Sequence, residues 1–329
     1  MELALSEEQA ELAATVRSLL AKRADSAAVR AAMTSDLGHD PALWETLVEQ
    51  IGLAALNIPE EFDGAGFSLF ESLVALEEIG RALAPSPLLS SLVVSEALLA
   101  GADDDAKALL LPRIAMGEVA AWVDGAGPVL HGDRADVLIA ATEAGLVEVD
   151  PATATRTWAE SMDQTIRLAR VDLTGATTTP IGDATAARER AALVGAVGVA
   201  ALQTGLAARA LEMTVAYTKE RVQFGRAIGS FQALKHRMAD LLVLVEMSRS
   251  ASWTASYAVA THAENAAHLA HVAKAYCGDA LDRIAAETIQ LHGGIAITWE
   301  HDAHLVFKRA HALGQLFGSA AQHRALVEL

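Results

Sequence analysis

Cysteine is almost absent from this chain: Cys277 is the single cysteine in 329 residues. A lone cysteine excludes an internal disulfide framework and is typical of proteins from a reducing compartment. We therefore expect Cys277 to be buried and to pack as a small apolar side chain. We also expect the protein to be soluble and cytoplasmic.

Basic residues are scarce as well. The chain has 25 lysines and arginines against 42 acidic residues, which gives a formal net charge of −17. Such a surface repels the phosphate backbone of nucleic acids, so general nucleic-acid binding is excluded as a function class. Any anion that the protein binds must be held locally by a few well-placed residues.

Long apolar runs are also scarce, and no uncharged run of about eighteen apolar residues stands out as a membrane span, so the sequence predicts none. The first residues, MELALSEEQAELAATVRSLL, are acidic where a secretory signal would be basic. What the chain does have is 52% hydrophobic residues, enough for more than one core. We therefore expect two or three subdomains.

The first third of the chain has the pattern of helices. Ser6-Glu7-Glu8-Gln9 is typical of a capped helix start, and apolar residues follow it at helical spacing. Further helical segments are separated by the turn-rich stretches NIPEEFDGAGF and LAPSP, and they cover residues 41–51, 68–83, 88–100 and 104–116. The sequence predicts an N-terminal helical domain over residues 1–117.

The pattern then changes to short, β-branched or alternating segments between turn residues. These segments are 119–123, 136–142, 145–150 and 165–173. They predict a small β domain over residues 118–182.

Long helical patterns return after residue 183. They cover residues 184–221, 231–260, 263–290 and 300–327. Four long amphipathic helices are typical of a bundle, so we expect a four-helix bundle over residues 183–329. The predicted fold class is mainly α with a small β domain.

The stretch RVQFGRAIGSFQ joins the first two bundle helices and has the residue types of an anion site. Arg221 stands at the end of one helix, Gly225 and Gly229 lie in the loop, and Gln232 opens the next helix. Glycines let the backbone approach an anion, and helix N-terminal amides point toward it. The alternative is that Arg221 is a solvated surface cation and the glycines only turn the chain.

A second stretch, QLHGGIAIT, ends the third bundle helix. Gln290 stands one turn before Gly293 and Gly294, which are ordinary helix-terminating residues. By itself this pattern indicates little more than a C-cap.

Together these stretches carry a family resemblance. AYTKERVQFGRAIGSFQALKHRMADL resembles the bundle signature of acyl-CoA dehydrogenases, and IQLHGGIAITWEHDAHLVFKRA resembles their final-helix signature. LSEEQAELAATVRSLL, LWETLVEQIGLAALNIPEEFDGAGFSLFESLVALEEIGRALAPSP and LLPRIAMGE resemble the corresponding N-terminal segments. The resemblance covers nearly the whole chain, and the motifs stand in the family's order.

The resemblance implies FAD as cofactor, shared across a subunit interface. In the family, the bundle of one subunit holds the ADP portion of the FAD whose isoalloxazine ring lies in the neighbouring subunit. Arg221 would then pair with the pyrophosphate. The residues that would contact the same ADP portion are Arg221, Gln223, Phe224, Gln232, Gln290, Gly293 and Gly294.

The expected catalytic base is missing. Acyl-CoA dehydrogenases remove a proton from Cα with a glutamate while hydride leaves Cβ for the flavin, so a carboxylate must lie beside the ring. One family position for that glutamate corresponds to Phe317 here, and the other corresponds to Gly195. The possible substitutes are Glu189, Glu212 and Glu300, although charged helix residues are usually on the solvated face.

The β domain is also short, and the family's TEP…GSD-like and WIT-like stretches, which meet the flavin ring, have no counterpart in it. This chain therefore resembles the smaller, base-lacking subunit of heterotetrameric bacterial acyl-CoA dehydrogenases of steroid side-chain degradation. The resemblance implies three partners: a larger subunit that carries the catalytic glutamate, an acyl-CoA substrate and an electron-transfer flavoprotein.

Two other functions stay open at this point. The first is a self-sufficient homomeric enzyme with a relocated base, and the second is a scaffold or regulatory protein that keeps the fold without flavin. A metal site at His301, His304 and His311 is also conceivable, because residues three apart share a helix face. No acidic or cysteine ligands accompany these histidines at metal-binding spacing, so we predict no metal site.

Overall fold

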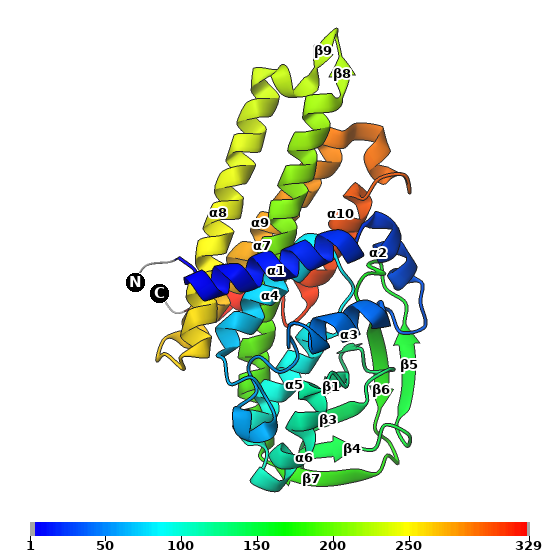
Figure 1. Cartoon of the computed structure of the whole chain (residues 1–329), viewed down its shortest axis with the longest axis vertical. Coiled ribbons are helices and arrows are strands. Elements are labelled where there is room, and N and C mark those ends of the chain that lie inside the picture. Colours follow the sequence, from blue (N-terminus) through cyan, green and yellow to red (C-terminus); the bar gives the residue numbers. More distant parts are fainter. Residues whose placement is uncertain (1–3, 328–329) are drawn as a thin grey trace.

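The computed structural model describes residues 4–327, and Figure 1 shows a long helical bundle with a small β region at one end. The N-terminal part is helical. Its helices are α1 (Glu7–Arg23), α2 (Ser26–Met33), α3 (Pro41–Glu49), the 3₁₀ turn η1 (Glu60–Phe62), α4 (Leu69–Ala82), α5 (Leu88–Gly101) and α6 (Asp104–Ala115). All the helices predicted in this region are present, and α2 is an additional one.

The helix starts follow from local sequence. Ser6 caps α1 and forms a capping box with Gln9, and Ser68 caps α4 in the same way with Glu71. Each box satisfies two backbone N–H groups that would otherwise lack a partner. These caps explain why the sequence alone located the helix starts so well.

The β region consists of two sheets. One contains β1 (Ala120–Asp124), β3 (Val137–Thr142), β4 (Gly145–Val149) and β7 (Thr178–Gly182), in the order β1-β3-β4-β7. The other contains β2 (Val129–Leu130), β6 (Leu168–Asp172) and β5 (Thr155–Ala159), in the order β2-β6-β5. β1 and β3 are parallel, with Ala120 opposite Val137, and the other pairs are antiparallel.

The bundle is built on α7 (Ala184–Glu220), which packs against α4, α5, α8 (Gln232–Ala260) and α9 (Ala266–His292). Within residues 4–327, α7 is the one helix that is long and apolar enough to cross a membrane. However, 89% of its most apolar window is buried inside the protein. It is therefore placed as the central core helix.

The predicted fourth bundle helix, 300–327, is wrong. The chain forms α10 (Ala303–Gln315) and then a separate short helix, α11 (Ala320–Ala325). The break comes at Phe317 and Gly318, whose φ angles of 53° and 99° are incompatible with a continuing helix. Ser319 then caps α11 in a capping box with Gln322.

Cys277 is buried in α9, as predicted. Burial raises the pKa of its thiol to about 12, so the side chain stays neutral and packs as a small apolar group. We propose residues 1–117, 118–182 and 183–329 as the domain limits of the chain.

Candidate functional site

The stretch after α7 forms a hairpin that projects from one end of the bundle, at the top of Figure 1. Arg221 follows the helix in extended conformation, and β8 (Val222–Gln223) pairs with β9 (Arg226–Ala227). Phe224 and Gly225 make the turn with φ angles of 52° and 75°. The ring of Phe224 is 91% exposed, so this aromatic side chain is available for contact with another molecule.

The end of α9 lies at the same end of the bundle. The Tyr217 and His292 rings stack with centroids 4.5 Å apart, and the hydroxyl oxygens of Thr214 and Thr288 lie 3.1 Å apart. Arg221 follows Tyr217 by one helical turn. Gly293 directly follows His292, so the ends of α7 and α9, about seventy residues apart in sequence, lie against each other at this end of the bundle.

The surface of this bundle end is open. Gln290 is exposed on the last turn of α9, and Gly293 ends that helix with φ 65°. A Cβ atom built on Gly293 or on Gly294 would meet nothing within 4 Å. The backbone at both glycines is therefore accessible to a bound group.

Arg221 is the free cation of the site. Its side chain is exposed and forms no hydrogen bond or ion pair with any residue in the range 4–327. Arg226, in contrast, lies over the Phe231 ring at 3.9 Å. Burial lowers the pKa of both His292 and His301, so these imidazoles are neutral near pH 7 and add no positive charge.

Two amide side chains complete the predicted set. The Gln223 amide donates to the Val222 carbonyl, 2.9 Å away, and Gln232 is the exposed first residue of α8. An exposed arginine, accessible glycines and a helix N-terminus fit the pyrophosphate of a dinucleotide cofactor.

The two positions to which the resemblance assigns the family's glutamate lie against each other. Gly195 is buried in α7, and a Cβ atom built on it would overlap the Phe317 ring. Phe317 therefore occupies the space above Gly195. Neither position carries an ionisable group, as the sequence predicted.

A cavity of about 330 Å³ opens beside Phe317, between α5, α7 and the β region. Asp124 is the one carboxylate that lines it within the described part of the chain, and the sequence analysis did not identify it. Arg188 binds that carboxylate at 2.8 Å and also donates to the Ala141 carbonyl at 2.9 Å. The Asp124 carboxylate is thus already engaged by a guanidinium within this chain.

The predicted substitute bases lie elsewhere. Glu212 pairs with Arg81, and Glu189 and Glu300 are exposed on the surface. None of the three lines the cavity beside Phe317. The structure therefore does not bring a substitute base to this cavity.

Each of the three histidines considered for a metal site contacts different neighbours. His301 packs against Tyr217 and His292, His304 packs against Trp299, and His311 lies 3.4 Å from Asp282. Residues 4–327 contain no group of three or more histidine, cysteine, aspartate or glutamate side chains that could hold a metal ion.

Comparison with known proteins identifies the family. Residues 6–118 match the model for the N-terminal domain of acyl-CoA dehydrogenases, and residues 184–328 match the model for their C-terminal domain. The chain belongs to the acyl-CoA dehydrogenase family. It is therefore an acyl-CoA dehydrogenase oxidoreductase, and the family is FAD-dependent.

Several members of the acyl-CoA dehydrogenase family are similar to this chain. Acyl-CoA dehydrogenase IpdE2 of Mycolicibacterium smegmatis is 48% identical over 314 residues, which cover 95% of this chain and 96% of the relative. A variant of the Tcur3481–Tcur3483 steroid acyl-CoA dehydrogenase superposes with a TM-score of 0.86 and 29% identity, covering 98% of this chain and 96% of that chain.

The ChsE4–ChsE5 complex of Mycobacterium tuberculosis shares the fold, with a TM-score of 0.89 and 23% identity over 99% of this chain and 98% of that chain. The steroid acyl-CoA dehydrogenase at 29% identity bears out the predicted resemblance to enzymes of that kind.

Proposed function

We propose that this chain is the subunit without a catalytic base in a heteromeric acyl-CoA dehydrogenase that acts on a steroid-derived CoA thioester. The observation that carries this proposal is the contact between Gly195 and Phe317. Both positions at which the resemblance places the family's glutamate are apolar, and the Phe317 ring leaves no room for a carboxylate at position 195. The base would therefore come from the partner subunit.

The bundle end would contribute the ADP-binding half of the cofactor site. FAD, when bound, accepts the hydride that leaves Cβ of the acyl chain. In this chain Arg221 would neutralise the pyrophosphate, and Gly293 and Gly294 would let the backbone approach it. Phe224, exposed at the hairpin tip, would pack against the cofactor or the partner. Gln223, Gln232 and Gln290 would donate hydrogen bonds to the same portion.

The partner would supply the larger share of the site: the flavin ring contacts, the acyl-CoA pocket and the glutamate. The names of the Tcur3481–Tcur3483 and ChsE4–ChsE5 structures, each with two unlike chains, support a heteromeric assembly. We infer that reduced flavin passes its electrons to an electron-transfer flavoprotein and that the complex works in the cytoplasm.

The alternative of a self-sufficient enzyme is less well supported, because Glu189, Glu212 and Glu300 lie outside the cavity beside Phe317. A flavin-free scaffold is also less well supported, because it gives no reason for an exposed arginine without a partner among residues 4–327 and two accessible glycines at one end of the bundle.

Visible absorption spectra and dehydrogenase assays would test the proposal, on this chain purified alone and co-expressed with a larger family member encoded beside it. We expect flavin and activity only in the mixed complex. Arg221→Gln should lower the flavin content of that complex by about tenfold or more, because one charge-assisted contact is lost. Arg283→Gln, at an exposed position on α9 outside this site, is the matched control.

A lone chain that carries flavin and is fully active would overturn the proposal. A mixed complex whose flavin content is the same with Arg221→Gln would remove the cofactor role from this bundle end.

A further inference from the structure

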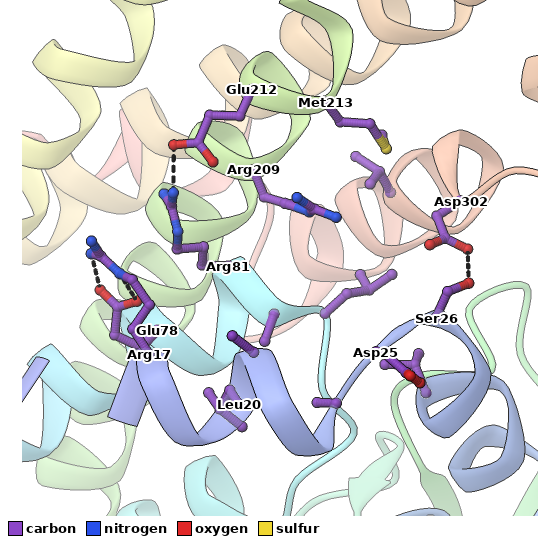
Figure 2. A pocket seen from close by; sticks show the side chains of 16 residues that line it. Arg17, Leu20, Asp25, Ser26, Glu78, Arg81, Arg209, Glu212, Met213 and Asp302 are labelled. Atoms are coloured by element: carbon purple, nitrogen blue, oxygen red, sulfur yellow. Dashed lines mark hydrogen bonds and ion pairs between the residues drawn. The ribbon is translucent and has the colours of Figure 1, made fainter. Parts of the chain in front are cut away.

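A pocket of about 470 Å³ opens between the N-terminal helices and the bundle, and the proposed function does not use it. Its walls come from α1, α2, α4, α7 and α10 (Figure 2). Small-molecule sites have volumes of about 300–1,000 Å³, so this pocket is large enough for a ligand. On α7 it lies at Arg209, about 18 Å along the helix from Arg221.

Two carboxylates of the pocket are engaged by arginines in its wall. Arg17 binds Glu78 in a bidentate contact at 2.6 and 2.8 Å, and Arg81 pairs with Glu212. Figure 2 shows both pairs side by side at one end of the pocket. Neither Arg17 nor Arg81 is therefore a free cation.

The other two carboxylates are engaged as well. Asp302 accepts from Ser26 at 2.7 Å and from Arg30 at 2.6 Å. Asp25 caps α2 by accepting from the Ala28 amide at 2.8 Å, where the helix dipole favours its negative charge. Every acidic group in the wall thus has its own donor.

Arg209 is different. It is exposed, and its guanidinium forms no hydrogen bond or ion pair within the described residues. Figure 2 shows it in the middle of the pocket, between the two arginine–glutamate pairs and Asp302, pointing into open space. It is the charged group in this wall that the protein itself leaves without a partner, and its five donors can bind a carboxylate in a bidentate fashion.

The rest of the wall is aliphatic. Leu20, Val29 and Leu83 are buried at its base, and Met213 and Val306 add partly or fully buried side chains. No aromatic side chain lines the pocket, so it offers no ring on which a nucleobase could stack. An aliphatic surface next to one free guanidinium fits an apolar body that carries a single anionic group.

We propose that this pocket binds an aliphatic carboxylic acid. Arg209 binds its carboxylate, and the surface around Leu20, Val29 and Met213 contacts its hydrocarbon chain. The site depends neither on the cofactor nor on the partner subunit. It is therefore independent of the proposed function, and failure of either leaves the other standing.

Isothermal titration of the full chain with decanoate would test this site. We expect one decanoate per chain. Arg209→Gln should weaken binding by about ten- to a hundredfold, because a charge-assisted contact is worth about 1.5–3 kcal/mol. Arg283→Gln should leave binding unchanged. Met213→Trp, which keeps the guanidinium but fills the pocket, should abolish it.

Three further measurements complete the test. Arg209→Lys keeps the charge but loses the bidentate geometry, so its affinity should lie between those of the wild type and Arg209→Gln. Inorganic phosphate and adenosine 5′-monophosphate should bind at least about tenfold more weakly than decanoate.

Absence of decanoate binding, or equal binding by wild type and Arg209→Gln, would overturn the site. Binding of phosphate or of the nucleotide as tightly as decanoate would overturn its assignment to an aliphatic carboxylate. If Arg209→Gln does not fold, the Arg209→Lys and Met213→Trp variants decide the question.

Discussion

Gly195 and Phe317 share one small space between α7 and the turn that precedes α11. We predict that Gly195→Ala destabilises the chain by about 1–3 kcal/mol, because the new methyl group overpacks against the Phe317 ring. In a Phe317→Ala background, the same substitution should be neutral or stabilising. Urea unfolding of the two single variants and the double variant measures this coupling.

Gly314→Ala is the matched control for this cycle. Gly314 also lies in a helix, but a Cβ atom built there meets nothing within 4 Å. Alanine should therefore stabilise position 314 by up to about 1 kcal/mol, in keeping with its higher helix propensity. If Gly195→Ala changes the free energy of unfolding equally with and without the Phe317 ring, the contact with that ring does not determine which side chains position 195 tolerates.

Residues near helix ends were predictable, and residues in long-range contacts were not. Arg221 and Gly293 follow helix ends that the sequence marks with turn residues, so their places in the fold could be predicted by pattern, while the cofactor role proposed for them comes from the family resemblance. Asp124 and Arg188 meet across 64 residues of sequence, and nothing near either residue signals the other. Arg209 has the pattern of an ordinary solvated helix residue, and its open pocket appears only when five helices are packed together.

The turn between α10 and α11 is held by side chains from α9 and α11. Lys274 is fully buried and donates to the Gly318 carbonyl at 2.7 Å, while the His323 imidazole contacts the Phe317 carbonyl at 2.7 Å. Both residues whose carbonyls are held have positive φ angles. These contacts fix the backbone from which the Phe317 ring reaches Gly195.

Lys274 should make stability depend on pH. Burial lowers the pKa of its ammonium group from 10.5 to about 8. Between these values the unfolded chain binds the proton and the folded chain does not, so the free energy of unfolding from this group rises with pH, by about 3 kcal/mol in all. Cys277, with its raised thiol pKa, contributes in the opposite direction above pH 9.

Comparison of the wild type with Lys274→Met isolates the lysine. Urea unfolding between pH 7.5 and 10.5 should show a stability difference that shifts in favour of the wild type as pH rises. A difference that stays constant with pH would mean that Lys274 has an ordinary pKa in the folded chain.

Capped helices were the elements best predicted from sequence. α1 and α4 begin with capping boxes, and the predicted start of α1 and the predicted limits of α4 lie close to the observed ones. Residues 300–327 were predicted to form a single helix because the apolar spacing continues through the break between α10 and α11. Gly318 followed by Ser319 was the available signal, a left-handed residue followed by a helix cap. The missed strands β2, β5 and β7 are short or largely exposed, so they lack a clear apolar pattern.

The bundle exposes an apolar face to solvent on α8. Leu242, Val243 and Met247 are 50%, 61% and 52% exposed, and they lie on neighbouring turns of this helix. We predict that this face is covered in the assembled enzyme. The double variant Val243→Asp, Met247→Glu should lower the amount of mixed complex on size-exclusion chromatography by about tenfold or more, since charges in an interface core are strongly unfavourable.

Leu109→Asp on α6 is the control for this experiment, because Leu109 is 61% exposed but lies on another helix. It should leave the complex intact. The α8 double variant should unfold like the wild type in the isolated chain. Complex formation that the α8 variant does not reduce would place the interface elsewhere.

At the scale of the whole molecule, the order of helices, sheet and bundle was predictable from hydrophobic periodicity. The family resemblance then supplied the expectation of a divided site. Neither hydrophobic periodicity nor the family resemblance could predict the geometry at places where segments far apart in sequence meet. The pocket around Arg209 and the cavity beside Phe317 are examples, because their walls come from several elements at once.

The Phe317 ring, which fills the space that a Cβ atom at position 195 would need, also limits how such a chain can change over evolutionary time. A glutamate can return to position 317 in one step, because that change removes the ring. A glutamate at position 195 has room only after the ring has gone, so the two routes to a base are unequal. We therefore expect the two positions to vary together among relatives, with a small residue at one wherever the other is large.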